Sequence, residues 1–233
     1  MGQTLIILRK EFKELLTSRS TVLSGLAMSL FFSVMYGILL TESSKALPAH
    51  ALDGAMFTLS AMLGVFMSYS FTSQVFLREK MTKVTETLLC APVSLRQIWL
   101  GKTLAVTLLS YAISLAGMGT LLTVASARNG DFIAPSLAVV FHIVFVVPAF
   151  IAAFGGLVGV AQMAMGMREN QIFGFIIFLP LFIGLNTIMG MSGGVTVAWW
   201  QVGLALGGSL ILLFIASFLT RFLSRERIVV TLA

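Results

Sequence analysis

Residues 132–167 read FIAPSLAVVFHIVFVVPAFIAAFGGLVGVAQMAMGM and contain no Lys, Arg, Asp or Glu. The hydrocarbon core of a bilayer is about 30 Å thick and takes about 20 apolar residues of helix, so this stretch is long enough to cross it. Pro135 near its start and Pro148 inside it favour an interfacial lead-in followed by one kinked helix. We therefore expect a membrane to be the solvent of this chain.

Similar stretches occupy most of the sequence. Of its 233 residues, 58% are hydrophobic and 10% are charged, which is more apolar material than one soluble core can bury. Further uncharged stretches cover residues 21–41, 54–77, 103–127 and 171–220. The last is too long for one helix, and the glycine-rich sequence at 189–194 favours a turn within it. We predict an all-α integral membrane protein with six transmembrane helices, forming a single domain over residues 1–233.

The basic residues predict the orientation of these helices. Lys and Arg near the ends of spans resist translocation and stay in the cytoplasm. With six alternating spans, the loops on one side carry only Lys45 and Arg128. The other side carries Arg9, Lys10, Lys13, Arg19, Arg78, Lys80, Lys83, Arg96, Lys102, Arg168, Arg221, Arg225 and Arg227. We expect both termini in the cytoplasm and the protein in the plasma membrane.

The N-terminal segment has its own pattern. Over residues 4–18 an apolar face of helical spacing (Leu5, Leu8, Phe12, Leu15, Leu16) opposes a charged face (Arg9, Lys10, Lys13, Glu14). This pattern predicts an amphipathic helix at the cytoplasmic interface. Because charged residues interrupt its apolar residues, we do not expect a cleavable signal peptide.

The longest polar interval covers residues 78–102 and has an internal pattern. Val84, Leu88 and Leu89 share one face of a short predicted helix, which Pro92 ends. Ser94 and Gln97 have the spacing of a capping box that begins the next helix. This predicts a rigid pair of helices that leaves the membrane and returns. Trp99 fits an anchor at the inner interface, and Trp199 with Trp200 fits one at the outer interface.

The sequence LREKMTKVTETLLCAPVSLRQIWLGK, residues 77–102, resembles the first cytoplasmic loop of type-2 ABC exporter permeases. The shared elements are the basic-acidic run 78–80, the Thr-Glu-x-Leu-Leu helix at 85–89, the Pro-Val-Ser corner at 92–94 and the Gly-Lys pair at 101–102. Residues 8–20 are similar to the connecting helix of the same family. The resemblance is specific over roughly the first 105 residues and topological thereafter.

This resemblance implies a permease subunit that couples ATP hydrolysis by a separate ATPase chain to substrate efflux. It implies a dimer with a second permease chain, identical or homologous, and two ATPase subunits. The docking residues would be Thr85, Glu86, Leu88, Leu89 and Pro92. Glu86 would meet Arg or Lys of the ATPase; alternatively, it only solvates an exposed helix face. The rival function is a membrane scaffold or channel subunit without an ATPase partner.

The sequence lacks the residues or motifs that several other functions require. No phosphate-binding G-x-x-x-x-G-K-[ST] motif occurs, so we expect no ATP hydrolysis by this chain and no enzymatic activity of its own. No sequence pattern indicates a metal site or a cofactor, and the single Cys90 cannot form an internal disulfide. The G-x-S-G at 190–193 matches rhomboid proteases, but both histidines precede it. The basic residues lie at span ends without a nucleic-acid module, so we expect lipids and protein partners only.

The predicted span interiors hold one ionisable residue, His142. We interpret it as a packing histidine with satisfied hydrogen bonds, since no proton or metal partner accompanies it in the sequence. A transport pathway through spans with so few charged residues suits an amphipathic or lipid-like cargo. The glycines at 155, 156 and 159 and those from 203 to 208 predict close helix contacts or a dimer seam.

Overall fold

The computed structural model describes residues 2–42, 49–81, 94–165, 183 and 197–223, which fold as helices with no strand among them. Five helical segments are long and apolar enough to cross a membrane: Arg19–Thr41, His50–Leu77, Leu95–Asn129, Leu137–Ala164 and Trp199–Phe222. They correspond to the first four and the last of the predicted spans. The predicted fifth span lies outside the described residues.

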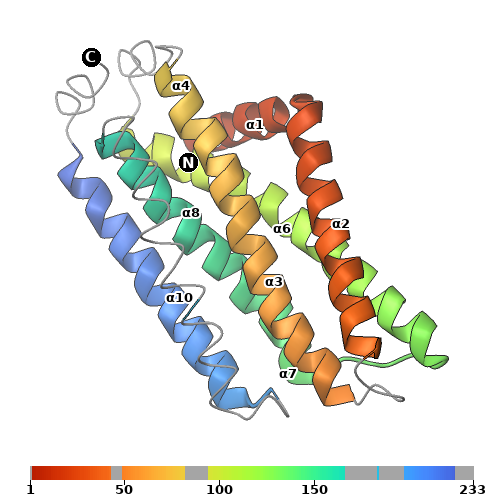
Figure 1. The fold of residues 1–233 in the computed structure, drawn as a ribbon. Helices are drawn as coiled ribbons and strands as arrows, with labels where there is room; N and C mark the ends of the chain where they lie inside the picture. Colours follow the sequence, from red (N-terminus) through yellow and green to blue (C-terminus); the bar gives the residue numbers. More distant parts are fainter. Residues whose placement is uncertain (1, 43–48, 82–93, 166–182, 184–196, 224–233) are drawn as a thin grey trace.

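The chain begins with α1 (Gly2–Thr17), which lies across one end of the bundle (Figure 1). A corner at Ser18 leads into α2 (Arg19–Glu42). Next, α3 (Ala49–Thr72) continues through a π-helical segment, η1 (Ser73–Leu77), into α4 (Arg78–Met81). The end of the bundle that carries α1 also carries α4.

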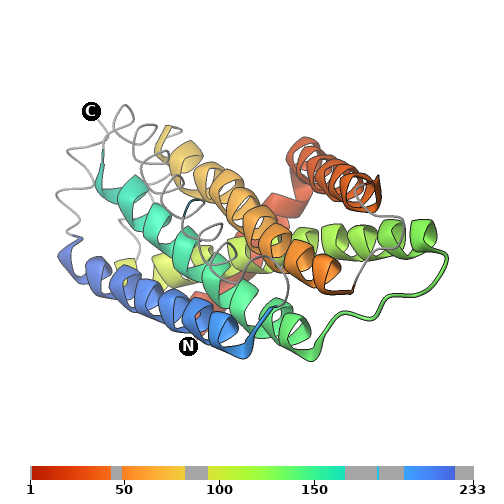
Figure 2. The ribbon, with the colours of Figure 1, turned by 60° about the horizontal axis from the view of Figure 1, so that its bottom comes forward.

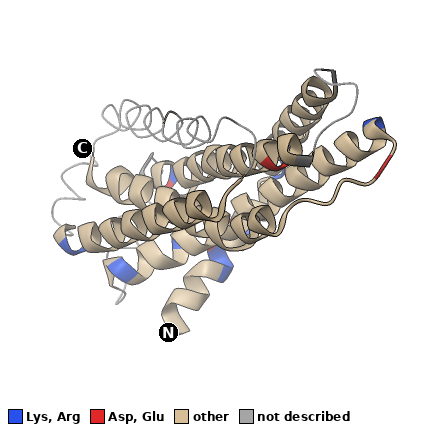
Figure 3. Cartoon of the chain, turned by 90° about the horizontal axis from the view of Figure 1, so that it is seen from below, with Lys and Arg blue, Asp and Glu red and all other residues tan. Residues whose placement is uncertain are grey.

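The centre of the bundle is α6 (Leu95–Asn129), which packs against α1, α2, α3 and α8. The remaining elements are α7 (Leu137–Phe141), the π-helical η2 (His142–Val146), α8 (Val147–Ala164), α10 (Trp199–Leu219) and the short 3₁₀ helix η3 (Thr220–Phe222). Turned by 60°, the bundle shows α10 beside α8, and α2 beside α6 (Figure 2). Charged residues lie mostly at helix ends (Figure 3).

The two prolines act as predicted. Residues 132–136, which include Pro135, form the irregular lead-in, and α7 begins at Leu137. Pro148 lies in the first turn of α8, directly after η2. Its ring nitrogen has no hydrogen to donate to the carbonyl of Val144, so the helix widens into a π-turn before it. The π-turn lets one helix continue past the proline.

Small residues allow the helices to approach closely, as the glycine pattern of α8 predicts. A Cβ on Gly155 would lie 2.5 Å from Ser68 Oγ, and one on Gly156 would lie 2.9 Å from the Trp99 ring. Hydroxyls cross-link the helices as well, because Ser68 donates to the Ile151 carbonyl. By contrast, within the described residues nothing lies within 4 Å of a Cβ on Gly203 or Gly207.

Trp99 does not have the predicted role of an interface anchor. Its side chain is 1% exposed, and its indole N–H donates to the Gly156 carbonyl at 2.9 Å. Gly156 leaves room for the ring, and the carbonyl satisfies its one polar group. Trp199 and Trp200, at the start of α10, are exposed, as expected for anchors.

The contact between α1 and α6 depends on Gly101. A Cβ there would lie 2.8 Å from Ile7 Cγ2 and 3.1 Å from the Thr4 carbonyl oxygen. We expect Gly101→Ala to displace α1 and to cost about 1–3 kcal/mol by overpacking. The matched control is Gly119→Ala in the same helix, where no atom of the described part of the chain lies within 4 Å of the added Cβ. Thermal denaturation in detergent, with limited proteolysis of α1, measures the difference; equal behaviour of the two variants would contradict the contact.

Candidate functional site

A buried lysine forms the centre of the candidate site, at the end of the bundle where α1 lies. The Lys102 ammonium donates to Glu79 Oε2 at 2.6 Å and to Glu11 Oε1 at 3.2 Å. It also donates to the Val75 carbonyl at 3.3 Å and lies 5.5 Å from the centre of the Phe76 ring. The Lys102 side chain is 3% exposed and that of Glu11 is 2% exposed. We call Glu11, Glu79 and Lys102 the ionic cluster.

Each residue of the ionic cluster comes from a different element. Glu11 belongs to α1, Glu79 to α4 and Lys102 to α6. In the sequence, Glu79 precedes segment 82–93 and Lys102 follows it. The cluster therefore joins both ends of the predicted coupling loop to each other and to the N-terminal helix.

Local sequence explains how Lys102 reaches this position. Ser94 caps α6, its hydroxyl accepting from the Gln97 amide at 3.3 Å while the Gln97 side chain accepts from the Ser94 amide at 3.1 Å. The predicted capping box is thus confirmed, and it fixes where the helix begins. Two turns later Gly101 admits α1, and the adjacent Lys102 meets Glu11.

A second lysine covers the cluster from outside. The Lys10 ammonium lies 3.3 Å from Glu11, 3.5 Å from Glu14 and 3.5 Å from Glu79, and its side chain is 42% exposed. Burial lowers the pKa of Lys10, but the three carboxylates outweigh that effect and the net pKa is raised. Oxygen atoms of Glu11, Glu14 and Glu79 lie within 4.8 Å of one another, and the two lysines compensate two of the three carboxylate charges.

Glu11 is the most perturbed carboxyl of the cluster. Burial raises its pKa above the ordinary value of 4.5, and repulsion from Glu79 adds to the rise. Lys102 and Lys10 oppose the rise without overcoming it. Burial dominates because the carboxylate loses far more hydration free energy on burial than the neutral carboxyl does.

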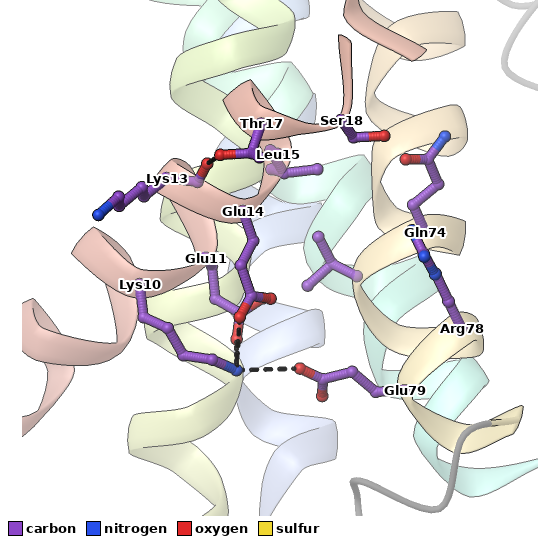
Figure 4. Close-up of a pocket in the computed structure, with 11 residues that line it drawn as sticks. Lys10, Glu11, Lys13, Glu14, Leu15, Thr17, Ser18, Gln74, Arg78 and Glu79 are labelled. Atoms are coloured by element: carbon purple, nitrogen blue, oxygen red, sulfur yellow. Dashed lines mark hydrogen bonds and ion pairs between the residues drawn. The ribbon is translucent and has the colours of Figure 1, made fainter. Parts of the chain in front are cut away.

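A cavity of about 740 Å³ opens beside the cluster, between α1 and the segment from η1 to α4 (Figure 4). Its walls carry side chains of both charge signs and two apolar side chains. The lining residues are Lys10, Glu11, Lys13, Glu14, Leu15, Thr17, Ser18, Gln74, Val75, Arg78 and Glu79.

The predicted docking residues Thr85, Glu86, Leu88, Leu89 and Pro92 lie outside the described residues, as does the G-x-S-G sequence. Lys102, which directly precedes the predicted span 103–127, is buried near the start of α6. Sequence reasoning counted Lys102 as a topological charge and missed Glu11 and Glu79. The signal for Glu11 was its place one turn before Leu15, on the side of α1 that faces the bundle.

His142 packs as predicted, but its hydrogen bonds are not satisfied. Its ring stacks on Phe57, with centroids 4.0 Å apart, and its side chain is 1% exposed. Neither ring nitrogen makes a well-formed hydrogen bond within the described part of the chain. The ring stacks on Phe57 at the start of η2.

Removing the central ammonium should be the most damaging change at the cluster. Lys102→Met leaves two carboxylates without their buried partner, and we expect a loss of about 3–5 kcal/mol. Lys13→Met, on the exposed side of α1, is the matched control and should leave the melting temperature unchanged. Thermal denaturation of both purified variants tests this, and a Lys102→Met variant as stable as the control would show that the cluster is not buried in solution.

Glu11→Gln should affect stability differently from Lys102→Met, because the glutamine side chain resembles the neutral carboxyl form that burial favours. A raised pKa in the folded protein means that this group contributes full stability below pH 4.5 and loses its contribution as pH rises through the raised pKa. We expect the variant to show a flatter dependence of melting temperature on pH from 4.5 to neutrality than the unmodified protein. Parallel curves would contradict the pKa shift.

No protein-family model and no curated protein matches this chain. Its function therefore has to be argued from the membrane helices and the ionic cluster.

Proposed function

We propose that this chain is the membrane-spanning permease subunit of an ATP-driven exporter, with ATP hydrolysis carried out by a separate subunit. The observation that carries the proposal is the ionic cluster. Glu79 precedes segment 82–93 and Lys102 follows it in α6, and the two side chains pair at 2.6 Å. A push on that segment would reach the ends of two transmembrane helices together.

The continuity of α6 supports the same mechanism. It runs for 35 residues without interruption, which corresponds to about 50 Å. A bilayer core needs about 20 residues, so one end of α6 extends beyond it. A rotation of its first turn would be carried to the opposite side as a rigid-body movement, which is how packed helices transmit small displacements.

Six crossings with both termini in the cytoplasm form part of the proposal. In Figure 1, α8 ends at the α1 end of the bundle, whereas α10 begins at the opposite end. A chain that joins these two positions has to pass from one end to the other. A sixth crossing between residues 165 and 197 accounts for this, and it leaves thirteen of the fifteen Lys and Arg residues on the α1 side.

The proposed assembly contains a second permease chain and two ATPase subunits, in the plasma membrane. Exposed apolar residues line α2 and α10, among them Phe31, Leu39, Ile211 and Phe214. Lipid or a second permease chain would cover them. Thr85, Glu86, Leu88, Leu89 and Pro92 are the proposed contacts with the ATPase, with Glu86 facing a basic residue.

The test is co-expression with an ABC-type ATPase from the same organism, beginning with any that a neighbouring gene encodes. The chain should co-purify with it and stimulate its ATP hydrolysis in liposomes. Glu86→Ala should weaken ATPase binding by roughly thirtyfold or more, as expected for losing one partner of an interfacial charge pair. Asp131→Asn, an exposed carboxylate at the other end of the bundle, is the control and should behave like the unmodified chain.

Normal association and stimulation by Glu86→Ala would refute the docking role. If no ATPase associates with the unmodified chain, the protein is instead a membrane scaffold or channel subunit.

A further inference from the structure

The cavity beside α1 differs from an ordinary surface hollow in its charge pattern. Its six charged lining residues are three carboxylates and three cations, and they occupy different parts of its wall. Glu11, Glu14 and Glu79 gather around the Lys10 ammonium, while Gln74 and Arg78 lie apart from them along η1 and α4 (Figure 4). The cavity thus has one end suited to an ammonium group and another suited to an anion.

The acidic end of the cavity already holds the ammonium group of Lys10. Lys10 lies within 3.5 Å of all three carboxylates, yet its side chain is 42% exposed. Glu14 is 59% exposed, so part of this end remains open to a ligand. A primary ammonium group from a ligand would share these carboxylates or displace Lys10 from them, because it makes the same charge-assisted hydrogen bonds.

The other end offers donors for an anion. Arg78 presents a guanidinium, whose planar N–H groups match phosphate geometry. Gln74 lies one helical turn before it on the same wall, and the Ser18 hydroxyl lines the cavity at the corner between α1 and α2. Since the lining charges sum to zero, a ligand with a net charge gains less here than a zwitterion.

The location identifies the source of such a ligand. The cavity lies where α1 crosses the ends of the membrane helices (Figure 1). We infer that this end of the bundle meets the lipid headgroups, because an amphipathic helix followed by apolar spans marks a membrane interface. Leu5 and Leu16 of α1 are exposed beside it, and Leu15 and Val75 give its wall an apolar part. A headgroup in the cavity could keep its acyl chains in the bilayer.

We propose that this cavity binds the headgroup of a zwitterionic phospholipid with a primary amine, a phosphatidylethanolamine, with the ammonium at Glu14 and its neighbours and the phosphate at Arg78. A phosphatidylcholine carries a quaternary ammonium that cannot donate hydrogen bonds, and a phosphatidylglycerol would bring an uncompensated negative charge to the carboxylates. The site does not depend on an ATPase partner. Its occupant would fasten α1 to the end of the bundle.

The experiment is native mass spectrometry of the purified full-length protein, released from nanodiscs that contain equal amounts of phosphatidylethanolamine, phosphatidylcholine and phosphatidylglycerol. We expect the ethanolamine lipid to be retained about tenfold more than either competitor, which is the value of one charge-assisted hydrogen bond. Equal retention of the three lipids, or preference for phosphatidylglycerol, would overturn the proposal.

Two variants locate the site. Glu14→Gln removes an exposed carboxylate that is not part of the ionic cluster, and we expect it to lower retention about threefold. Arg78→Gln should lower retention about tenfold. Arg9→Gln, on exposed α1 surface outside the cavity, is the control and should retain lipid normally. Normal retention by both cavity variants would place the lipid elsewhere and refute the assignment.

Soluble glycerophosphoethanolamine separates the headgroup from the lipid. It presents the same ammonium and phosphate without acyl chains, so we expect it to displace the lipid only at concentrations far above that of the lipid. Displacement at equal concentration would overturn the membrane lipid as the ligand and assign the cavity to a soluble phosphate ester.

Discussion

The buried ammonium of Lys102 is the constraint on which this end of the molecule depends. A charge out of water costs several kcal/mol unless close partners compensate it, and its partners here come from different helices. Glu11 and Glu79 can both reach it only when α1, α4 and the start of α6 meet. We interpret the cluster as a device that fixes position rather than one that adds net stability. Gly101 complements it by letting α1 lie against α6 without a side chain between them.

The same constraint connects the fold to the proposed function. An exporter driven by a separate ATPase needs a rigid link between a cytoplasmic contact and the membrane helices. Here the two ends of segment 82–93 are tied together, and the N-terminal helix is tied to both. After segment 82–93, the Ser94 cap and the uninterrupted helix α6 stiffen the chain where it leads back into the bundle. In this scheme α1 moves with the loop instead of serving only as a membrane anchor.

Hydropathy and charge predicted much of the fold, because the bilayer imposes simple rules on length and polarity. Five predicted spans appear where uncharged stretches lie, and the effects of Pro135, Pro148 and the Ser94–Gln97 pair followed from local backbone chemistry. The site was harder to foresee. Glu11, Glu79 and Lys102 are far apart in sequence, and only the crossing of α1 over α6 brings them together. Trp99 was misjudged for the same reason, since Gly156 of another helix provides its space and its acceptor.

The most direct test of the account is the distance between α1 and the start of α6, measured by pulsed electron spin resonance. Nitroxide labels on exposed Arg9 and Arg96, each changed to Cys in a variant with Cys90→Ser, report this distance without touching the cluster. The account predicts a narrow distance distribution with Lys102 in place and a broad one after Lys102→Met. A distribution of the same width in both proteins would show that Lys102 does not hold α1 against the bundle.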